Sequence, residues 1–230
     1  MSVRPLKLLS SMATRELLAE LADDYAHRSG RPVAAEAAGG VDVAKRVEAG
    51  EAVDIVVLAR NAIDKLIGAG RLIAGSRVDL VRSGVSVAVR AGAPKPDIGS
   101  EEAVKRAVLA AQSLSYSTGP SGVHLEQLFA RWGILERIRA RIVVPKPGIP
   151  VGSLVASGEA QLGFQQLSEL MRLPGVEVLG PLPAGIQAIT IFSGGIGSRS
   201  DDPQARSLLE FLGSADTAAI KQRHGMEAAD

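Results

Sequence analysis

Short apolar runs alternate with helical patterns along most of this chain. The runs Leu6–Leu9, Val33–Ala37 and Asp54–Ala59 are typical of strands, and apolar residues at helical spacing separate them. A second series starts with Val85–Arg90 and includes Ile138–Val144, which the pattern also predicts as a strand. Regular alternation of strands and helices indicates βα units in a mainly parallel sheet, so we predict an α/β fold.

Two breaks in this alternation predict domain boundaries. Proline and glycine cluster at 92–99, and a second crossing is expected near 186–192, before two closing helices. We therefore predict two α/β domains joined by two crossing strands. Residues 1–84 and 191–230 form domain I, and residues 85–190 form domain II.

Composition narrows the class of partner. The 230 residues carry 26 basic and 25 acidic side chains without a long run of one sign. This balance does not indicate a basic surface that would bind nucleic acid. No apolar run approaches the roughly 18 residues of a membrane span. The chain has no cysteine, which excludes thiol catalysis and thiolate metal sites. We expect a monomer with a small-molecule partner and with neither metal nor cofactor.

The N-terminus does not match a secretory signal. MSVRPLKLLSS has two basic residues but lacks an apolar stretch of roughly 7 to 15 residues and a small-residue cleavage site. We expect a periplasmic protein if a leader has been removed, and a cytoplasmic one if the chain is complete.

Five predicted loops share one composition. In an open α/β sheet the ligand lies outside the carboxyl ends of the strands, and these loops follow strands or precede helices there. They are rich in Gly, Ser, Thr and Gln, and Lys146 is their only charged residue. Neutral N–H and O–H donors suit a dehydrated anion. The loops are SSM at 10–12, AAGG at 37–40, YSTGPSG at 116–122, PKPGIP at 145–150 and FQQ at 164–166.

Known catalytic and nucleotide motifs fit poorly. YSTGPSG lacks the lysine of a phosphate-binding P-loop, and no G-x-S-x-G elbow is present. None of the three histidines has a carboxylate at metal-ligand spacing. His124 lies in the first turn of a helix that begins at the predicted site, and with Glu36 it is the only titratable candidate for catalysis there.

Four segments resemble the molybdate-binding branch of the type II periplasmic solute-binding proteins. They are VAKRVEAGEAVDIVVLA at 43–59, SGVHLEQLFARWGI at 121–134, SLVASGEAQLGF at 153–164 and SLLEFLGSADTAAIKQRHGM at 207–226. The resemblance covers essentially the whole chain. It implies two α/β domains that close over an anion bound in a cleft, and a partner permease of the ABC-transporter type.

The resemblance also implies which residues contact the ligand. Met12 and the pair Gly39 and Gly40 stand where molybdate binders have hydroxyl side chains, and Gln166 stands where they often have tyrosine. Each missing hydrogen bond to a charged group removes about 1.5 to 3 kcal/mol, so a larger anion such as a carboxylate is expected. Its expected ligands are Ser10, Ser11, Met12, Gly39, Gly40, Ser117, Thr118, Ser121, Gly148, Gln165 and Gln166.

Three functions remain open from the sequence. The first is a small-anion receptor of a transporter, which the absence of a convincing catalytic constellation favours. The second is an enzyme on the same scaffold, of the aconitate isomerase kind, acting on a tricarboxylate through His124 or Glu36. The third is a cytoplasmic ligand-sensing domain.

Overall fold

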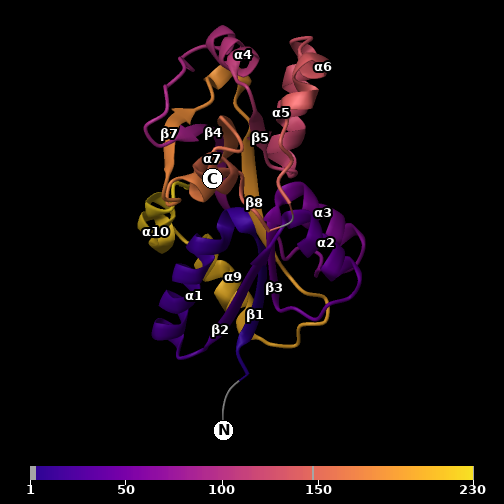
Figure 1. Ribbon diagram of the computed structural model, residues 1–230. Coiled ribbons are helices and arrows are strands. Elements are labelled where there is room, and N and C mark those ends of the chain that lie inside the picture. The colour runs from indigo at the N-terminus through magenta and orange to yellow at the C-terminus, as the bar shows by residue number, and fades with distance from the viewer. Residues whose placement is uncertain (1–3, 147, 230) are drawn as a thin grey trace. The chain divides into compact units, whose positions relative to one another are not determined.

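The computed structural model describes residues 4–146 and 148–229, which divide into two compact units. Unit 1 comprises Met1–Arg82 and Ile191–Asp230, and unit 2 comprises Ser83–Thr190. Two strands run from one unit into the other, β4 (Val78–Arg90) and β8 (Ile189–Ile196) (Figure 1). The fold class predicted from the sequence, α/β with two crossing strands, is confirmed.

Unit 1 is built from βα units around a central strand. Strand β1 lies between β2 and β3 and is parallel to both, with Ser11 opposite Ala38 and Ser10 opposite Val57. Strand β8 adds antiparallel to β3. The elements of unit 1, besides parts of β4 and β8, are β1 (Leu6–Ser11), η1 (Met12–Thr14), α1 (Arg15–Ser29), β2 (Val33–Ala38), α2 (Gly40–Glu48), β3 (Ile55–Ala59), α3 (Arg60–Gly68), α9 (Gln204–Gly213), η4 (Ala215–Thr217), α10 (Ala218–Arg223) and β9 (Glu227–Ala228).

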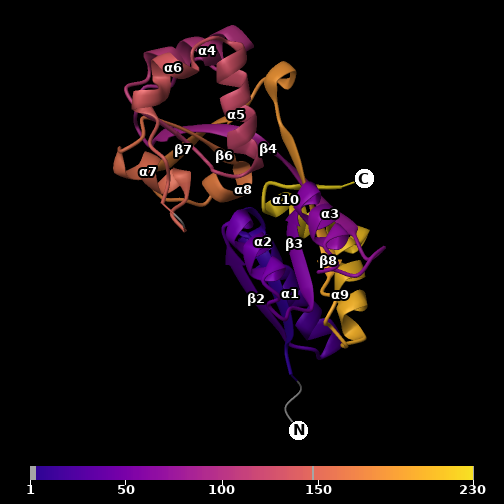
Figure 2. The ribbon, with the colours of Figure 1, turned by 90° about the vertical axis from the view of Figure 1, so that its right-hand side faces the viewer.

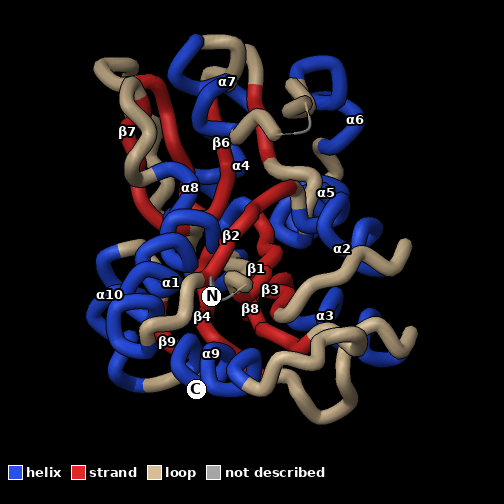
Figure 3. The backbone as a smooth tube through the Cα atoms, turned by 90° about the horizontal axis from the view of Figure 1, so that it is seen from below, coloured by secondary structure: helices blue, strands red, loops and turns tan. Residues whose placement is uncertain are grey.

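Helices cover both faces of the unit 1 sheet. Figure 3 shows α2 and α3 on one side of the strands and α1, α9 and α10 on the other. Alternate residues of β3 supply the two cores: Val56 and Leu58 pack under α2 and α3, while Ile55 and Val57 pack under α1 and α9. Burial on both faces explains why β3 is a continuous apolar run rather than an alternating one.

Unit 2 has a mixed sheet in which β6 lies between β4 and β5. Strand β6 is parallel to β5 and antiparallel to β4, and β7 pairs with the other edge of β4. Figure 2 shows α4, α5 and α6 on one side of this sheet and α7 and α8 on the other. The elements are α4 (Glu101–Ala110), β5 (Leu114–Tyr116), α5 (Pro120–Arg131), α6 (Leu135–Ile138), η2 (Arg139–Arg141), α7 (Val151–Ser157), β6 (Leu162–Gln166), α8 (Leu167–Leu170), β7 (Val176–Pro181) and η3 (Ala184–Ile186).

The strand predicted over Ile138–Val144 is wrong. This stretch contains the end of α6 and the turn η2, and only Ile142 makes an isolated bridge, to Leu114. The apolar residues Ile134 and Ile138 are spaced by four, and both are buried in the unit 2 core. Helical burial therefore prevails over the strand propensity of the isoleucines and valines.

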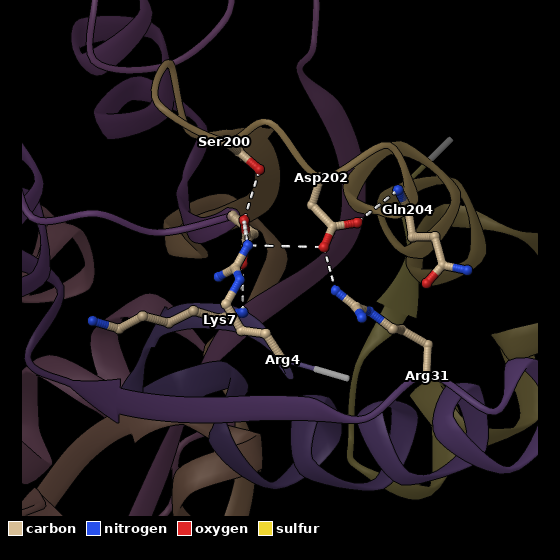
Figure 4. A network of polar contacts seen from close by, with 7 residues as sticks. Arg4, Lys7, Arg31, Ser200, Asp202 and Gln204 are labelled. Atoms are coloured by element: carbon tan, nitrogen blue, oxygen red, sulfur yellow. Dashed lines mark hydrogen bonds and ion pairs between the residues drawn. The ribbon is translucent and has the colours of Figure 1, made fainter. Parts of the chain in front are cut away.

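A polar network closes the amino end of the unit 1 sheet (Figure 4). The carboxylate of Asp54, just before β3, accepts hydrogen bonds from the Arg4 guanidinium, the Lys7 N–H at 2.8 Å and the Ser200 hydroxyl at 2.7 Å. Asp202 lies between Arg4 and Arg31 and accepts from the Gln204 N–H at 3.0 Å. The network ties β1, β2 and β3 to the segment that follows β8.

Candidate functional site

The carboxyl ends of β1, β2 and β3 lie at one edge of the unit 1 sheet, here called the carboxyl edge. The parallel register brings the loop at 10–12 beside the loop at 37–40, as their place after parallel strands predicts. A Cβ placed on Gly40 would lie 3.7 Å from the Cβ of Ser11, so these two residues are neighbours. Two of the five predicted loops therefore meet within unit 1.

The two serines of the carboxyl edge are buried but weakly bonded. Ser10 and Ser11 are 2% and 7% exposed. The Ser10 hydroxyl donates to the Ser11 carbonyl at a long 3.4 Å, and the Ser11 hydroxyl lies 3.4 Å from that of Thr14. Distances near 3.5 Å are poor hydrogen bonds, so both hydroxyls keep capacity for a better acceptor. Met12 follows in η1 and is half-buried.

Gly39 and Gly40 begin helix α2. Gly39 is the N-cap residue, and its carbonyl accepts from the Val43 N–H at 2.9 Å. The N–H groups of the first turn point out of the helix and are an anion site in general terms. Asp42 folds back over this turn, with its carboxylate oxygen 2.9 Å from the place of a Gly39 Cβ. This exposed carboxylate lies beside the N–H groups of the first turn, and the sequence analysis missed it.

In unit 2, YSTGPSG joins β5 to α5 by a tight turn. Gly119 caps the helix, and its carbonyl accepts from the N–H groups of Gly122 and Val123 at 3.0 and 3.1 Å. A Cβ on Gly122 would lie only 1.7 Å from the Ser117 carbonyl oxygen, so no side chain fits there. The turn brings the Ser117 and Ser121 hydroxyls to 2.7 Å of each other.

The same turn borders a cavity of about 380 Å³ that lies within unit 2. The Tyr116 hydroxyl donates to the Glu126 carboxylate at 3.1 Å, and burial together with this carboxylate raises the pKa of Tyr116 above its ordinary value. The cavity reaches from the serine turn along α5 to apolar residues of the following segment. Its lining is Tyr116, Ser117, Thr118, Gly122, Val123, Glu126, Leu135, Arg139, Ile142 and Val144.

The two candidates for acid–base chemistry have different surroundings. His124 Nε2 lies 2.9 Å from the carbonyl oxygen of Ile186, so this ring nitrogen donates and Nδ1 of a neutral ring keeps its lone pair. Glu36 lies on β2, where the hydrogen bond from Arg46 lowers the pKa of its carboxyl group. His124 belongs to unit 2 and Glu36 to unit 1. His124 Nδ1 keeps an unshared lone pair, whereas the Glu36 carboxylate is engaged by Arg46.

Gln165 and Gly148 flank helix α7. The Gln165 side chain is 3% exposed; its oxygen accepts from the Gly152 N–H at 3.3 Å and its nitrogen donates to Glu169 at 2.8 Å. It therefore orders the first turn of α7. Gly148 has a φ of 78°, in the left-handed region that favours glycine.

Gln166 lies where the crossing strands meet. With its nitrogen oriented toward β4, the side chain donates to the Ser83 and Gly84 carbonyls and accepts from the Thr190 hydroxyl at 3.1 Å. Gln187, which the sequence analysis missed, also binds β4, accepting from the Val85 N–H at 2.8 Å. The buried amide of Gln166 and the half-buried amide of Gln187 join β4 to the segment at the start of β8, so Gln166 has a structural role at the strands that connect the units.

Within residues 4–146 and 148–229, no group of three or more His, Cys, Asp or Glu side chains is placed to bind a metal ion. Among the same residues, no helix has the length and apolar character required to cross a bilayer.

The chain is similar to known proteins over nearly its full length. It is 39% identical to an aconitate isomerase of Pseudomonas sp. over 98% of this chain and 88% of that protein. Its fold is similar to the periplasmic molybdate-binding protein of Azotobacter vinelandii, with a TM-score of 0.82, 22% identity and coverage of 98% and 100%. The sulfate-binding protein SubI of Mycobacterium tuberculosis has a TM-score of 0.79 at 14% identity, with coverage of 99% and 88%.

The family assignment rests on the sequence. The family described as bacterial extracellular solute-binding protein matches residues 6–227. The resemblance predicted from the four sequence segments is confirmed, and the chain belongs to the bacterial extracellular solute-binding protein family.

Proposed function

We propose that this chain binds a tricarboxylate of the aconitate type and interconverts its isomers. The observation that carries the proposal is the 39% identity to an aconitate isomerase, which extends over 98% of this chain. The sequence alone favours a receptor over an enzyme. The identity reverses that order, because the molybdate-binding and sulfate-binding proteins share the fold at only 22% and 14% identity.

The donors of the loops support a carboxylate as ligand. The weakly bonded hydroxyls of Ser10 and Ser11 and the paired hydroxyls of Ser117 and Ser121 are neutral donors. Hydroxyl and N–H donors bind an anion without bringing a counter-ion. In unit 1, Gly40 leaves space that a hydroxyl side chain occupies in a molybdate site.

The chemistry requires one base that returns its proton. His124 Nδ1 takes a proton from the methylene carbon of aconitate, and the double bond moves by one carbon. The same ring N–H then gives the proton to the carbon that was vinylic. Atoms and electrons balance without a co-reactant. The hydrogen bond from Nε2 to Ile186 fixes the tautomer that leaves Nδ1 as the acceptor.

The test is a time course of trans-aconitate with the purified chain, followed by proton NMR. We expect cis-aconitate to appear until the two isomers reach equilibrium. The variant His124→Gln keeps a donor for the Ile186 carbonyl and should lower the rate by about 100-fold or more. His27→Gln is a matched control, because the His27 ring also bonds a main-chain carbonyl, that of Asp23.

A second set of variants separates the two candidate bases. Glu36→Gln should leave the rate within about threefold of the wild-type value, because Arg46 already engages this carboxylate. Loss of activity in Glu36→Gln with full activity in His124→Gln would reverse the assignment of the base. No conversion by the wild-type chain, under conditions where it binds aconitate, would reject the enzyme.

Solute capture for transport is the second candidate. It is favoured by the family itself, whose description is an extracellular solute-binding protein. In that case the chain binds an anion without turnover and delivers it to a permease. Thermal shift with molybdate, sulfate, phosphate, citrate and aconitate separates the ligands, since a ligand at 100 times its dissociation constant adds about 2.7 kcal/mol to the free energy of unfolding. Stabilisation by molybdate and by none of the other anions would contradict the proposal that the ligand is a carboxylate.

A further inference from the structure

A positively charged side chain, that of Arg60, lies at the carboxyl edge of unit 1 and is not among the residues predicted to contact the ligand. Arg60 is the first residue of α3 and directly follows β3. The register of β1 and β3 places Ser10 opposite Val57, so the chain leaves both strands at the same edge. The five predicted loops, in which Lys146 is the only charged residue, do not include the segment after β3. The carboxyl edge is therefore less neutral than its serines and glycines indicate.

The Arg60 side chain is oriented by two other residues. Its Nε donates to Asp79 Oδ1 at 3.3 Å, and its Nη2 forms an ion pair with Asp79 Oδ2. Asp79 Oδ1 also accepts from the Ser193 hydroxyl at 2.5 Å. Asp79 lies on β4 and Ser193 on β8, the two strands that continue into unit 2. One side of the guanidinium is thus fixed against the crossing strands.

The other side of the guanidinium is available. The Arg60 side chain is 39% exposed, and its Nη1 makes no hydrogen bond with any residue in 4–146 or 148–229. Burial favours the neutral acid at Asp79, but the hydrogen bonds from Ser193 and Arg60 prevail and lower the pKa of its carboxyl group. Asp79 therefore stays ionised at neutral pH and keeps the guanidinium in one orientation.

We propose that Arg60 binds one carboxylate of the ligand through the Nη1 side of its guanidinium, and that Asp79 and Ser193 position it. The inference rests on the proposed function and adds the element that selects a polycarboxylate. Neutral hydroxyl and N–H donors suffice to bind one carboxylate. A ligand with two or three carboxylates requires a positively charged side chain to bind the additional ones. Arginine matches a carboxylate with a planar pair of donors.

Arg77 provides a matched control for this role. It is 38% exposed, pairs with Asp64 on α3, and has its Nε 3.7 Å from Asp79 Oδ1. Arg60→Gln and Arg77→Gln each remove one guanidinium of similar exposure from the surroundings of Asp79. A purely structural role for Arg60 predicts similar effects of the two changes. A binding role predicts that ligand affinity falls in Arg60→Gln alone.

The experiment is calorimetric titration with propane-1,2,3-tricarboxylate, which has no double bond to isomerise, and with acetate. We expect Arg60→Gln to weaken tricarboxylate binding by at least about tenfold and Arg77→Gln by less than about threefold. Acetate binding should change little in either variant. Arg60→Lys keeps the charge without the planar pair of donors and should give an intermediate loss.

The outcomes separate this inference from the function it rests on. Tricarboxylate binding by the wild type that is unchanged in Arg60→Gln, or equally weakened in Arg77→Gln, overturns the role of Arg60 and leaves the proposed function standing. No carboxylate binding by the wild type overturns both. Thermal unfolding of each variant identifies a folding defect; if Arg60→Gln is unfolded, Arg60→Lys decides by the same comparison with Arg77→Gln.

Discussion

The two edges of the unit 1 sheet carry different kinds of side chain. At the edge where the strands begin, here called the amino edge, the side chains of Arg4, Lys7, Glu51, Asp54 and Asp202 form a dense set of ion pairs. At the carboxyl edge the same three strands end in Ser11, Ala38 and Ala59. Charged side chains thus link the strands at the amino edge, whereas at the carboxyl edge the strands themselves end in small residues, with Arg60 directly after Ala59.

The difference lies in where the hydrogen bonds go. At the amino edge Asp54 is 2% exposed and four donors from Arg4, Lys7 and Ser200 satisfy its carboxylate. At the carboxyl edge the hydroxyls of Ser10 and Ser11 have, within residues 4–146 and 148–229, only 3.4 Å contacts. A satisfied network contributes to folding, while weakly used donors can serve a ligand. We expect substitutions at the amino edge to change stability and those at the carboxyl edge to change binding.

The largest effect should come from Asp54→Ala. The change leaves the Lys7 N–H and the Ser200 hydroxyl without their acceptor and should lower the free energy of unfolding by about 3 kcal/mol. Urea denaturation followed by circular dichroism measures this loss. Under conditions where the variant is folded, its affinity for propane-1,2,3-tricarboxylate should match the wild-type value. A large loss of affinity would contradict the separation of the two edges.

The next effect is a change of ligand preference by Gly40→Ser. A Cβ at Gly40 would lie 3.7 Å from the Ser11 Cβ and 3.8 Å from Leu58 Cδ2, which are ordinary van der Waals contacts. The new hydroxyl should raise affinity for molybdate and lower affinity for the tricarboxylate, each by about tenfold. Calorimetric titration of the wild type and the variant with each anion measures both changes in affinity. Gly68→Ser, at the open C-terminal end of α3, is the control and should change neither affinity.

The sequence predicts the carboxyl edge better than the amino edge. Local patterns predict successive βα units, and parallel strands bring the loops at 10–12 and 37–40 together without knowledge of any side-chain contact. The amino edge depends on pairs such as Arg4 with Asp54 and Arg31 with Asp202, which are 50 and 171 residues apart. No local pattern identifies such partners.

The side-chain partners near the proposed site are hard to predict for the same physical reason. Arg60 directly follows the apolar strand β3, as the loop at 10–12 follows the apolar run Leu6–Leu9. Including the segment after β3 among the predicted loops would therefore have identified Arg60 from the sequence. Its orientation by Asp79 and Ser193 could not be predicted, because those residues come from two distant strands. The link that the Gln166 amide makes between β4 and Thr190 could not be predicted either. A side chain's partners depend on the strands that cross beside it.

Acid should weaken the amino edge through Glu51. Hydrogen bonds from Arg46 and Lys7 lower the pKa of this carboxyl group from 4.5 to about 2. A lowered folded-state pKa stabilises the fold fully above the unfolded value and loses that contribution as the pH falls toward 2. Because Glu51 is partly exposed, we expect Glu51→Gln to cost about 1 kcal/mol at pH 6 and nothing near pH 2.

Melting temperatures of the wild type and Glu51→Gln between pH 2 and 7 test this expectation. The two curves should converge as the pH falls through the window between the unfolded and folded pKa values. A constant difference across the range would mean that Glu51 acts through packing rather than charge.

The smallest effect should come from Asp42→Asn, because this carboxylate, unlike those of the amino edge, is expected to weaken ligand binding. Asp42 covers the first turn of α2 beside Gly39, where its charge stabilises the helix but repels an incoming anion. Asp42→Asn should cost less than about 1 kcal/mol of stability and raise tricarboxylate affinity by about threefold at low salt. Glu48→Gln removes the same charge from the other end of α2 and should leave affinity unchanged. If Asp42→Asn weakens binding instead, its carboxylate orders the N–H donors for the ligand, and the carboxyl edge, like the amino edge, depends on a fixed negative charge.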